Sequence, residues 1–329
     1  MKILVVGGAG YIGSHVCKSF IENGDEVTVF DNFSSGLKEN LQAGAKCFEG
    51  DILQEKELHA VCSENKFEGI IHLAALKAAG ESMEIPEIYA KNNISGAINL
   101  LNAAVAYNIP HFVFSSTAAV YGEPKYLPVD EKHPTNPENF YGYTKLATEN
   151  MLNWYDKLKN ISFASLRYFN AAGYAADSSI TGLEKSPQNL LPVVMETACG
   201  IRKKMQVFGE TYLTEDGTCI RDYVHVSDLA QAHVQALSYL QRTGTSFTVN
   251  LGSEQGASVM EIINMAESIT GKTINYEITG KRPGDATKLL ASSSLAKRLL
   301  GWEPKYSDIN CLVQTTWKAY RHHFPDGDK

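Results

Sequence analysis

The stretch Lys2-Ile-Leu-Val-Val-Gly-Gly-Ala-Gly-Tyr-Ile-Gly13 places a short apolar run directly before a turn rich in glycine. Residues 2–6 are typical of a strand buried inside a parallel sheet, and the pattern after the turn predicts a helix from Ser14 to Glu22. A second strand is expected at Val27–Phe30, and it leads into Asp31, eighteen residues beyond Gly13. Together these features form the fingerprint of a dinucleotide-binding βαβ unit.

Each part of this fingerprint has a physical reason. Gly7, Gly10 and Gly13 would let the backbone turn tightly and approach a pyrophosphate, whose charge the helix N-terminus favours. Asp31 would accept hydrogen bonds from ribose hydroxyls and would repel a 2′-phosphate, which favours NAD over NADP as the cofactor. A glycine turn that merely connects a strand to a helix is the simpler alternative, and the two strands and Asp31 argue against it. Ser14 stands where a phosphate-loop ATPase requires Lys, which excludes that class.

Strands and helices continue to alternate through the first half of the chain. Further strands are expected at 46–49, 70–74, 112–114 and 163–166, and helices at 54–63, 85–107 and 141–158. This alternation predicts an α/β fold, a doubly wound parallel sheet of the Rossmann type with a smaller α/β domain toward the C-terminus. We expect residues 1–172 to form the Rossmann domain and residues 173–329 the second domain, with a segment of about 222–252 returning to the first.

Tyr141 and Lys145 stand four residues apart in the last of these expected helices, so they share one of its faces. A phenol titrates near pH ~10 and is a poor base at neutral pH, but a neighbouring ammonium favours the phenolate. Such a pair could pass a proton to and from a substrate hydroxyl. The same spacing is common on helix surfaces without any chemical role, so its meaning depends on a hydride acceptor nearby.

Composition argues against several other functions. A net charge of −7 and a pI of about 5.8 make nucleic acid or an anionic membrane an improbable main partner. No apolar run approaches the ~20 residues of a membrane-spanning helix, and the first residues lead into glycines without a cleavage-like site, so we expect a cytoplasmic protein. The six cysteines are scattered and no HExxH motif occurs, so we expect reduced thiols and no bound metal.

Further motifs are distributed along essentially the whole chain. They are Leu76-Lys-Ala-Ala-Gly-Glu-Ser82, Asn92-Asn93, Phe114-Ser-Ser-Thr-Ala-Ala-Val-Tyr-Gly122, Gln188-Asn-Leu190, Thr214-Glu-Asp-Gly-Thr218, Arg221-Asp-Tyr-Val-His225 and Arg282-Pro-Gly-Asp285. With these motifs the chain resembles the extended short-chain dehydrogenase/reductase family. The glycine turn and the Tyr/Lys pair specify only the superfamily, whereas residues 76–82 and the motifs of the second half resemble its UDP-glucose 4-epimerases.

The resemblance implies a role for each matching residue. Tyr141 would be the acid/base, Lys145 its partner and Thr117 the catalytic hydroxyl. The residues that would hold NAD are Gly7, Gly10, Tyr11, Ile12, Gly13, Asp31, Asn32, Asp51, Ile52, Lys77, Asn92, Tyr141, Lys145 and Tyr168. Those that would hold a UDP-hexose are Lys77, Thr117, Tyr141, Asn170, Asn189, Leu190, Phe208, Arg221, Arg282 and Asp285. Residues 173–329 would then be a UDP-sugar-binding domain.

The implied activity is the interconversion of UDP-galactose and UDP-glucose at sugar carbon 4, through a transient 4-keto sugar and with NAD as a resident cofactor. The resemblance also implies a homodimer, in which helices near residues 92–107 and 141–157 pack across the interface. Leu289 lies at the family position that limits sugar size. It is smaller than Tyr and larger than Ser, which leaves open whether N-acetylated UDP-sugars are accepted.

Two other functions are weighed against this one. A nucleotide-sugar 4,6-dehydratase shares the first oxidation, but its pattern has Asp-Glu directly after the Thr, where this chain has Ala118-Ala119. An NAD(H)-binding module without catalysis is the second alternative, and it would not need Tyr141, Lys145 and Thr117 together.

Overall fold

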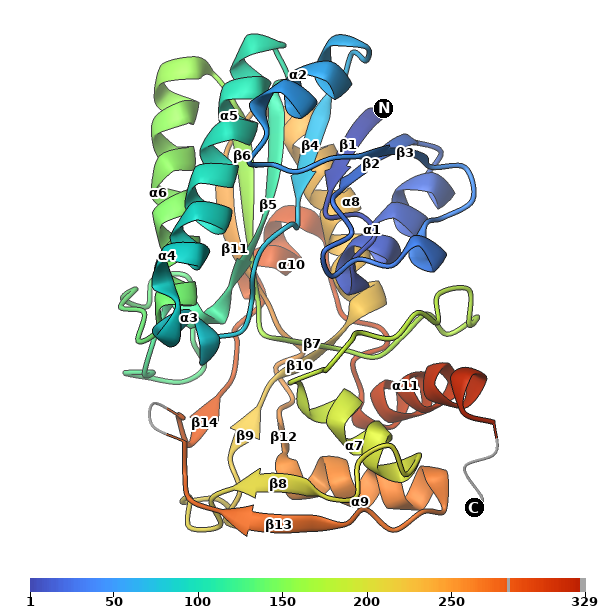
Figure 1. The fold of residues 1–329 in the computed structure, drawn as a ribbon. Coiled ribbons are helices and arrows are strands. Elements are labelled where there is room, and N and C mark those ends of the chain that lie inside the picture. The colour runs from blue at the N-terminus through green and yellow to red at the C-terminus, as the bar shows by residue number, and fades with distance from the viewer. Residues whose placement is uncertain (283–284, 326–329) are drawn as a thin grey trace.

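The computed structural model describes residues 1–282 and 285–325, and a seven-stranded parallel sheet lies at its centre (Figure 1). The strand order across the sheet is β11-β6-β5-β4-β1-β2-β3. Its strands are β1 (Lys2–Val6), β2 (Glu26–Asp31), β3 (Lys46–Glu49), β4 (Gly69–His72), β5 (His111–Thr117), β6 (Ser162–Tyr168) and β11 (Phe247–Leu251). Every neighbouring pair is parallel, so all seven carboxyl ends lie at one edge of the sheet.

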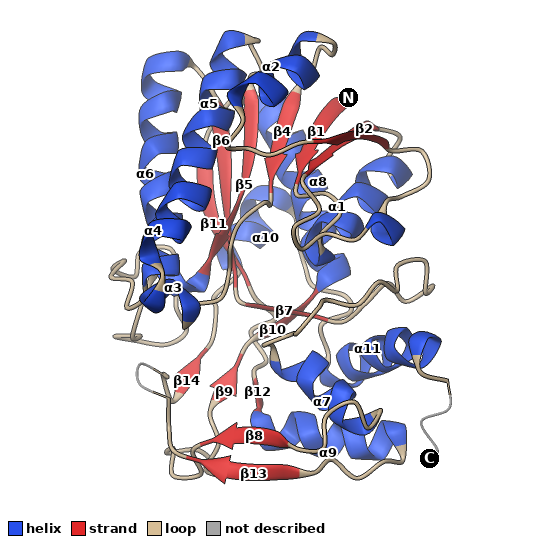
Figure 2. Cartoon of the chain, viewed as in Figure 1, coloured by secondary structure: helices blue, strands red, loops and turns tan. Residues whose placement is uncertain are grey.

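The sheet is buried on both faces, as an all-parallel sheet requires. Ile3 and Val5 of β1 belong to one buried cluster, while Leu4 and Val6 belong to another, because successive side chains point to opposite faces. Helices cover each face (Figure 2). On one face they are α1 (Tyr11–Glu22), α8 (Val226–Thr243) and α10 (Ser294–Leu300), and on the other α2 (Glu55–Ser63), α5 (Gly96–Ala106) and α6 (Phe140–Lys159). The predicted doubly wound α/β sheet is confirmed.

A smaller part lies beyond the carboxyl edge of the sheet (Figure 1). Its strands are β8 (Met205–Phe208) with β13 (Tyr276–Thr279), and β9 (Ile220–Arg221) with β12 (Ala257–Ser258) and β14 (Lys288–Leu289). Its helices are α7 (Leu190–Ala198), α9 (Val259–Thr270) and α11 (Ile309–His323). A separate buried cluster unites these helices, and the pair β7 (Asn170–Ala172) and β10 (Tyr223–His225) lies between the two parts.

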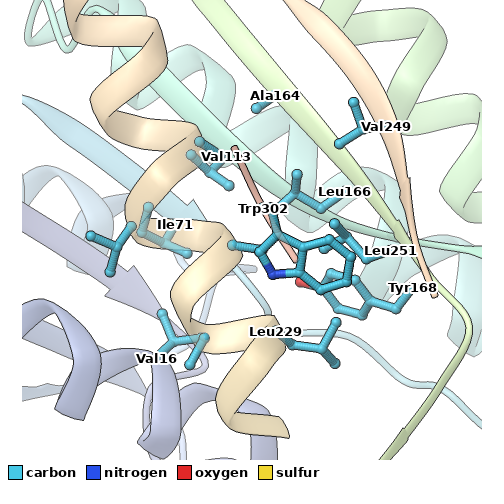
Figure 3. Close-up of a cluster of buried hydrophobic side chains, with 14 of the residues drawn as sticks. Val16, Ile71, Val113, Ala164, Leu166, Tyr168, Leu229, Val249, Leu251 and Trp302 are labelled. Carbon is cyan, nitrogen blue, oxygen red and sulfur yellow. The ribbon is translucent and has the colours of Figure 1, made fainter. Parts of the chain in front are cut away.

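Several segments from the second half of the chain pack into the first. β11 pairs with β6 and α8 packs against α1, and the expected return of about 222–252 covers both elements. A later return was not expected from the sequence: α10 packs against α8 and β11, and the Trp302 side chain enters the same buried cluster (Figure 3). Trp302 is 1% exposed, and its indole Nε1 donates to the Asp228 carbonyl at 2.8 Å.

The single helix expected at 85–107 is wrong in detail. The structure has short helices α3 (Glu81–Glu84) and α4 (Pro86–Tyr89), then a π-helical turn η2 (Ala90–Ser95), and only then α5. Pro86 starts a new helix because it has no backbone N–H to continue the preceding one. The remaining described elements are the short 3₁₀ turns η1 (Lys38–Asn40) and η3 (Ala118–Val120). No helix among the described residues is long and apolar enough to cross a membrane.

Replacing Trp302 should show how strongly the end of the chain stabilises the Rossmann sheet. Trp302→Ala leaves a cavity in the cluster of Figure 3, and we expect it to lower the free energy of unfolding by about 3–5 kcal/mol, measured by urea denaturation. Leu213→Ala is the control, because Leu213 is 97% exposed and its truncation should cost less than ~0.5 kcal/mol. Equal midpoints for the two variants would contradict this account.

Candidate active site

The glycine turn lies where the order of the strands reverses. From β1 the chain proceeds to β2 on one side, while β4 lies on the other, and ligands of open α/β sheets bind at such a point. Gly7 has φ +85° and approaches the backbone of β4's end so closely that a Cβ would lie 2.6 Å from the Ala74 nitrogen. At Gly13 a Cβ would lie 2.0 Å from the Gly7 carbonyl oxygen. Only glycine fits both positions.

The N-terminus of α1 is suited to an anion. Helix α1 begins at Tyr11, earlier than the expected Ser14, so the N–H groups of Tyr11 and Ile12 belong to its first turn. No side chain of the described residues caps the helix at Gly10, and its first turn contains no acidic residue. First-turn N–H groups have no partner within their own helix, so these donors and the helix dipole can serve a pyrophosphate.

Asp31 connects the turn to the neighbouring strand. It is buried at the end of β2, where Oδ2 accepts from the Ala9 N–H at 2.9 Å and Oδ1 from the Phe33 N–H at 2.9 Å. Each carboxylate oxygen can accept more than one hydrogen bond, so capacity for ribose hydroxyls remains. Asn32 donates from Nδ2 to Asp51 Oδ2 at 3.1 Å, and buried Ile52 follows Asp51. The residues present therefore fit a dinucleotide.

Two expected cofactor contacts have partners within the chain. The Lys77 ammonium forms an ion pair with Glu184, which lies in the loop between β7 and α7. Asn92 lies in the π-helical turn η2 and donates from Nδ2 to Asn93 Oδ1 at 3.0 Å. Asn93 in turn donates to the Leu76 carbonyl and to Thr144 Oγ1, and thereby ties this turn to α6.

Tyr141 and Lys145 occupy the first turns of α6, whose start two neighbours fix. The Asn139 side chain caps the helix by accepting from the Gly142 N–H at 2.8 Å, and the Tyr141 N–H donates to Ser82 Oγ at 3.0 Å. The Lys145 ammonium donates to the Ser115 carbonyl at 2.8 Å and lies 5.9 Å from the centroid of the Tyr141 ring. The two side chains thus share one helix face, as the spacing predicts.

The surroundings make this pair chemically unusual. Burial of the Tyr141 phenol raises its pKa to about 12, and a hydrogen bond with the Thr117 side chain opposes the rise. Burial lowers the pKa of Lys145 to about 7, against the Glu149 carboxylate, which raises it. A neutral phenol and a readily deprotonated ammonium within one site can exchange a proton with a bound hydroxyl near neutral pH.

Tyr168, expected near the cofactor, lies at the end of β6 and is 5% exposed. Its hydroxyl lies 2.5 Å from His233 Nε2, and burial raises the pKa of the phenol far above its usual value. The hydroxyl also bonds the Ser115 side chain, the residue whose carbonyl holds Lys145. In this structure Tyr168 therefore supports the carboxyl end of β5, which holds Lys145 through the Ser115 carbonyl.

One subset of the expected substrate residues lies beyond the carboxyl edge of the sheet, on β7 and at the start of α7. Asn170 of β7 donates from Nδ2 to the Asp222 carbonyl at 3.0 Å. Asn189 is the exposed N-cap residue of α7, and Leu190 is the first residue of the helix. The Asn189 side chain makes no capping hydrogen bond with the described residues. An open amide at a helix N-terminus is a suitable group for reading a polar ligand.

A second subset lies in the smaller part, on strands β8 and β9 and in the loop between β13 and β14. The Arg282 guanidinium stacks on the Phe208 ring at 3.6 Å from its centroid. Arg221 of β9 donates from Nη2 to Asp285 Oδ1 at 3.2 Å and from Nη1 to the Ala286 carbonyl at 2.7 Å. Leu289 of β14 is the parallel partner of Arg221. Pro283 and Gly284, the middle of the motif at 282–285, lie outside the described residues.

The sequence did not identify the residues that hold other site residues in place. Ser82, Asn93 and Ser115 lie inside quoted motifs but received no role. Glu184 had no sequence signal, because its pairing with Lys77 spans a distance of 107 residues along the chain. Among the residues that the structure describes, no group of three His, Cys, Asp or Glu side chains is arranged to hold a metal ion.

Such a turn at the edge of a parallel sheet, with such a Tyr/Lys pair on a helix beside it, is typical of the short-chain dehydrogenase/reductase superfamily. Comparison with known proteins agrees: residues 3–252 match the model of the NAD dependent epimerase/dehydratase family. The UDP-glucose 4-epimerase of Lacticaseibacillus casei is 43% identical over 99% of this chain and 98% of its own length. The chain belongs to this family, and to its group of UDP-glucose 4-epimerases.

Solved structures give the same result. A UDP-glucose 4-epimerase from Brucella ovis in complex with NAD superposes with a TM-score of 0.95 at 38% identity, over 97% of this chain and 98% of that one. One from Bifidobacterium longum in complex with NAD⁺ and UDP superposes with a TM-score of 0.93 at 34% identity, over 99% of this chain and 100% of that one.

Gly13→Ala should separate the cofactor turn from the rest of the fold. Its Cβ would lie 2.0 Å from the Gly7 carbonyl oxygen, so the turn must move, and we expect at least a tenfold loss of NAD bound per purified chain. NAD is measured by absorbance after release, and circular dichroism checks the fold. Gly280→Ala is the control, because a Cβ there meets no atom within 4 Å among the described residues. Unchanged NAD content in Gly13→Ala would show that the turn does not hold it.

Proposed function

We propose that this protein is an isomerase that interconverts UDP-galactose and UDP-glucose at sugar carbon 4, with NAD as its resident cofactor. Its relatives named above carry that activity in their names. The observation that carries the proposal is the position of Tyr141, Lys145 and Thr117 at the carboxyl edge of the sheet, close to a turn suited to NAD. A place in galactose metabolism and in the cytoplasm is part of the proposal. All six cysteines lie within the described residues and are free thiols.

The turn from Gly7 to Gly13 and Asp31 would hold the pyrophosphate and a ribose of NAD, whose nicotinamide supplies a hydride acceptor and, once reduced, a hydride donor. Lys145 of α6, whose ammonium reaches the Ser115 carbonyl on β5, would also bind ribose hydroxyls. Because the hydride is returned to the substrate, the reaction has no net redox change. NAD can therefore stay bound from one turnover to the next.

Proton transfer is the task of the chain's own side chains. Tyr141 takes the proton from the 4-hydroxyl of the sugar as carbon 4 is oxidised, and returns it when carbon 4 is reduced on its opposite face. Lys145 favours the phenolate form through its charge. Thr117, which bonds Tyr141, donates to the oxygen of the transient 4-keto sugar. Tyr141 is consequently base in one half of the reaction and acid in the other.

The residues that follow Thr117 distinguish this reaction from an elimination. Ala118 and Ala119 form the short turn η3, in which the Ala119 N–H donates to Thr117 Oγ1 at 3.1 Å. A 4,6-dehydratase needs an added acid/base pair at these positions, and a methyl group can neither give nor take a proton. The 4-keto sugar therefore has reduction as its next step, and the dehydratase alternative is not favoured.

The sugar nucleotide would lie against the smaller part. Arg221 and Arg282 supply planar, permanently charged donors for a diphosphate. In this structure Arg221 is bonded to Asp285 and Arg282 is stacked on Phe208, so each guanidinium is already oriented. Asn189, exposed at the start of α7, would read the base or a ribose.

The assignment of Tyr141 is tested by incubating the purified protein with UDP-galactose and no added cofactor. We expect the wild-type protein to form UDP-glucose, and Tyr141→Phe to reduce kcat about 10²–10⁴-fold, because the general acid/base is gone. Tyr143→Phe is the matched control: it removes the hydroxyl of a 51% exposed tyrosine in the same turn and should keep full activity. Wild-type turnover in Tyr141→Phe would refute the role, and bound NAD without any turnover in the wild type would favour the non-catalytic module.

We also propose a homodimer that packs through α6 and its neighbours. Three large apolar side chains of α6 are exposed in the single chain: Tyr143 at 51%, Trp154 at 62% and Leu158 at 66%. Their spacing of eleven and four residues puts them on one helix face. Ile88 of α4, 48% exposed, adds to the apolar surface beside it, because α4 contacts α6. Burying such a stripe against a second copy would remove it from water.

Changing this stripe should dissociate the dimer. Trp154→Glu together with Leu158→Glu places two charges on the proposed interface, and we expect light scattering during gel filtration to show half the wild-type mass. Leu213→Glu, at a 97% exposed site elsewhere, should leave the mass unchanged. A wild-type protein that is already monomeric at micromolar concentration would contradict the proposed dimer.

A further inference from the structure

A buried ion pair lies directly behind the proton relay. Glu149 is one helical turn beyond Lys145 on α6 and is 3% exposed, and Arg167 of β6 is 7% exposed. Glu149 Oε2 accepts from Arg167 Nη2 at 2.6 Å, and Oε1 accepts from Arg167 Nε at 2.9 Å. This is the bidentate geometry in which Arg and carboxylate bind most strongly. A charged pair this deeply buried is expensive to desolvate, which calls for an explanation other than stability.

The pair is joined to the strand end that carries the relay. Glu149 Oε1 also accepts from Ser116 Oγ at 2.5 Å, and Arg167 is the β-sheet partner of Ser116 in the β5–β6 register. Ser116 stands between Ser115, whose carbonyl binds the Lys145 ammonium, and Thr117, which bonds Tyr141. Glu149 therefore holds the middle of a three-residue segment whose two ends hold the relay.

Arg167 is itself fixed on its far side. Its Nη1 donates to the Tyr121 hydroxyl at 2.8 Å, and that hydroxyl donates to Asn250 Oδ1 at 2.7 Å. Asn250 Nδ2 then donates to the Val129 carbonyl at 3.0 Å. The guanidinium cannot swing away without breaking this chain of bonds, so the Glu149 carboxylate keeps a fixed place relative to Lys145.

We propose that Glu149, held by Arg167 and Ser116, is a positioning residue for the reaction: it fixes the segment Ser115–Thr117 and maintains the charge of the Lys145 ammonium beside Tyr141. The proposal rests on the function given above. Since Glu149 would act through Lys145 and Thr117 and touches neither substrate nor cofactor, its removal should leave binding of the UDP-sugar largely intact.

The groups around the pair support an electrostatic role for Glu149. On β4, His72 faces Lys145, and burial lowers the pKa of this imidazole to about 3, so it is neutral at working pH. On β6, burial raises the pKa of Tyr168, so that phenol is also neutral, while Arg167 stays charged. Glu149 supplies the negative charge that raises the pKa of Lys145, against the burial that lowers it to about 7.

The sign of the expected pH effect follows from this arrangement. Without the Glu149 charge the pKa of Lys145 falls further, so the ammonium is lost at a lower pH. The positive charge that favours the Tyr141 phenolate is then absent at a pH where the wild type still has it. The titration of Lys145 and the limb on which activity falls as pH rises should therefore both move to lower pH.

The main test is Glu149→Gln, which keeps the size of the side chain and removes its charge. Ionisation of Lys145 is followed by NMR as the shift of the ¹³Cε signal of labelled lysine that is missing from the same protein carrying Lys145→Arg, a readout independent of turnover. We expect the Lys145 midpoint to fall by about one pH unit, and kcat at pH 7 to fall about fivefold with KM changed less than twofold. The descending limb of the kcat profile should move down by a similar amount.

Three further proteins keep the test decisive. Glu149→Asp retains the charge and should restore the Lys145 midpoint with partial kcat. Should the unpaired Arg167 prevent Glu149→Gln from folding, the double variant Glu149→Gln/Arg167→Gln removes both charges, and its Lys145 midpoint should still fall. Glu196→Gln is the control, because Glu196 of α7 pairs with Arg202 at 2.5 Å, outside the relay, and neither readout should change.

The outcomes separate this proposal from the proposed function. An unchanged Lys145 midpoint together with an unmoved pH limb, in Glu149→Gln and in the double variant alike, would show that the pair is only structural and would overturn the proposal. Wild-type protein without epimerase activity would instead overturn the proposed function, while the Lys145 titration would still report on Glu149.

Discussion

A parallel sheet that is buried on both faces is the constraint on which the rest of this structure depends. Parallel strands need crossover helices, and each helix needs one apolar stripe against the sheet, so β1 alternates its side chains between the two clusters. Because every strand runs the same way, all carboxyl ends meet at one edge. The glycine turn after β1, Asp31 after β2 and Thr117 at the end of β5 are brought to that edge by this arrangement alone.

Chemistry at this edge relies on charges that burial makes expensive. Lys145 is 3% exposed, and burial lowers the pKa of its ammonium to about 7, while the nearby Glu149 carboxylate raises it. The same burial that destabilises this charge also strengthens its effect on Tyr141, since the local dielectric is low. Stability and reactivity are therefore linked through one helix, α6, whose successive turns carry Tyr141, Lys145 and Glu149.

The two parts of the molecule are more interwoven than their order along the chain indicates. β11 and α8 complete the sheet and cover it, and Trp302, near the C-terminal end, fills the cluster beneath α8. A single tryptophan has no periodicity of its own, so its destination could not be read from local sequence. The π-helical turn at Ala90–Ser95 was missed for a related reason: it depends on Asn93 bonding Leu76 and Thr144, both remote in sequence.

The sequence by itself determined the alternating α/β fold, the glycine turn, the candidate acid/base pair and the family, because these depend on local periodicity and on residue types at fixed spacing. Only the tertiary structure decided which groups surround that pair. Arg167 and Glu149 are 18 residues apart, Lys77 and Glu184 are 107 apart, and such partners meet through the packing of separate elements. Charge states at the site follow from those meetings, since burial and neighbouring charges are properties of the folded chain.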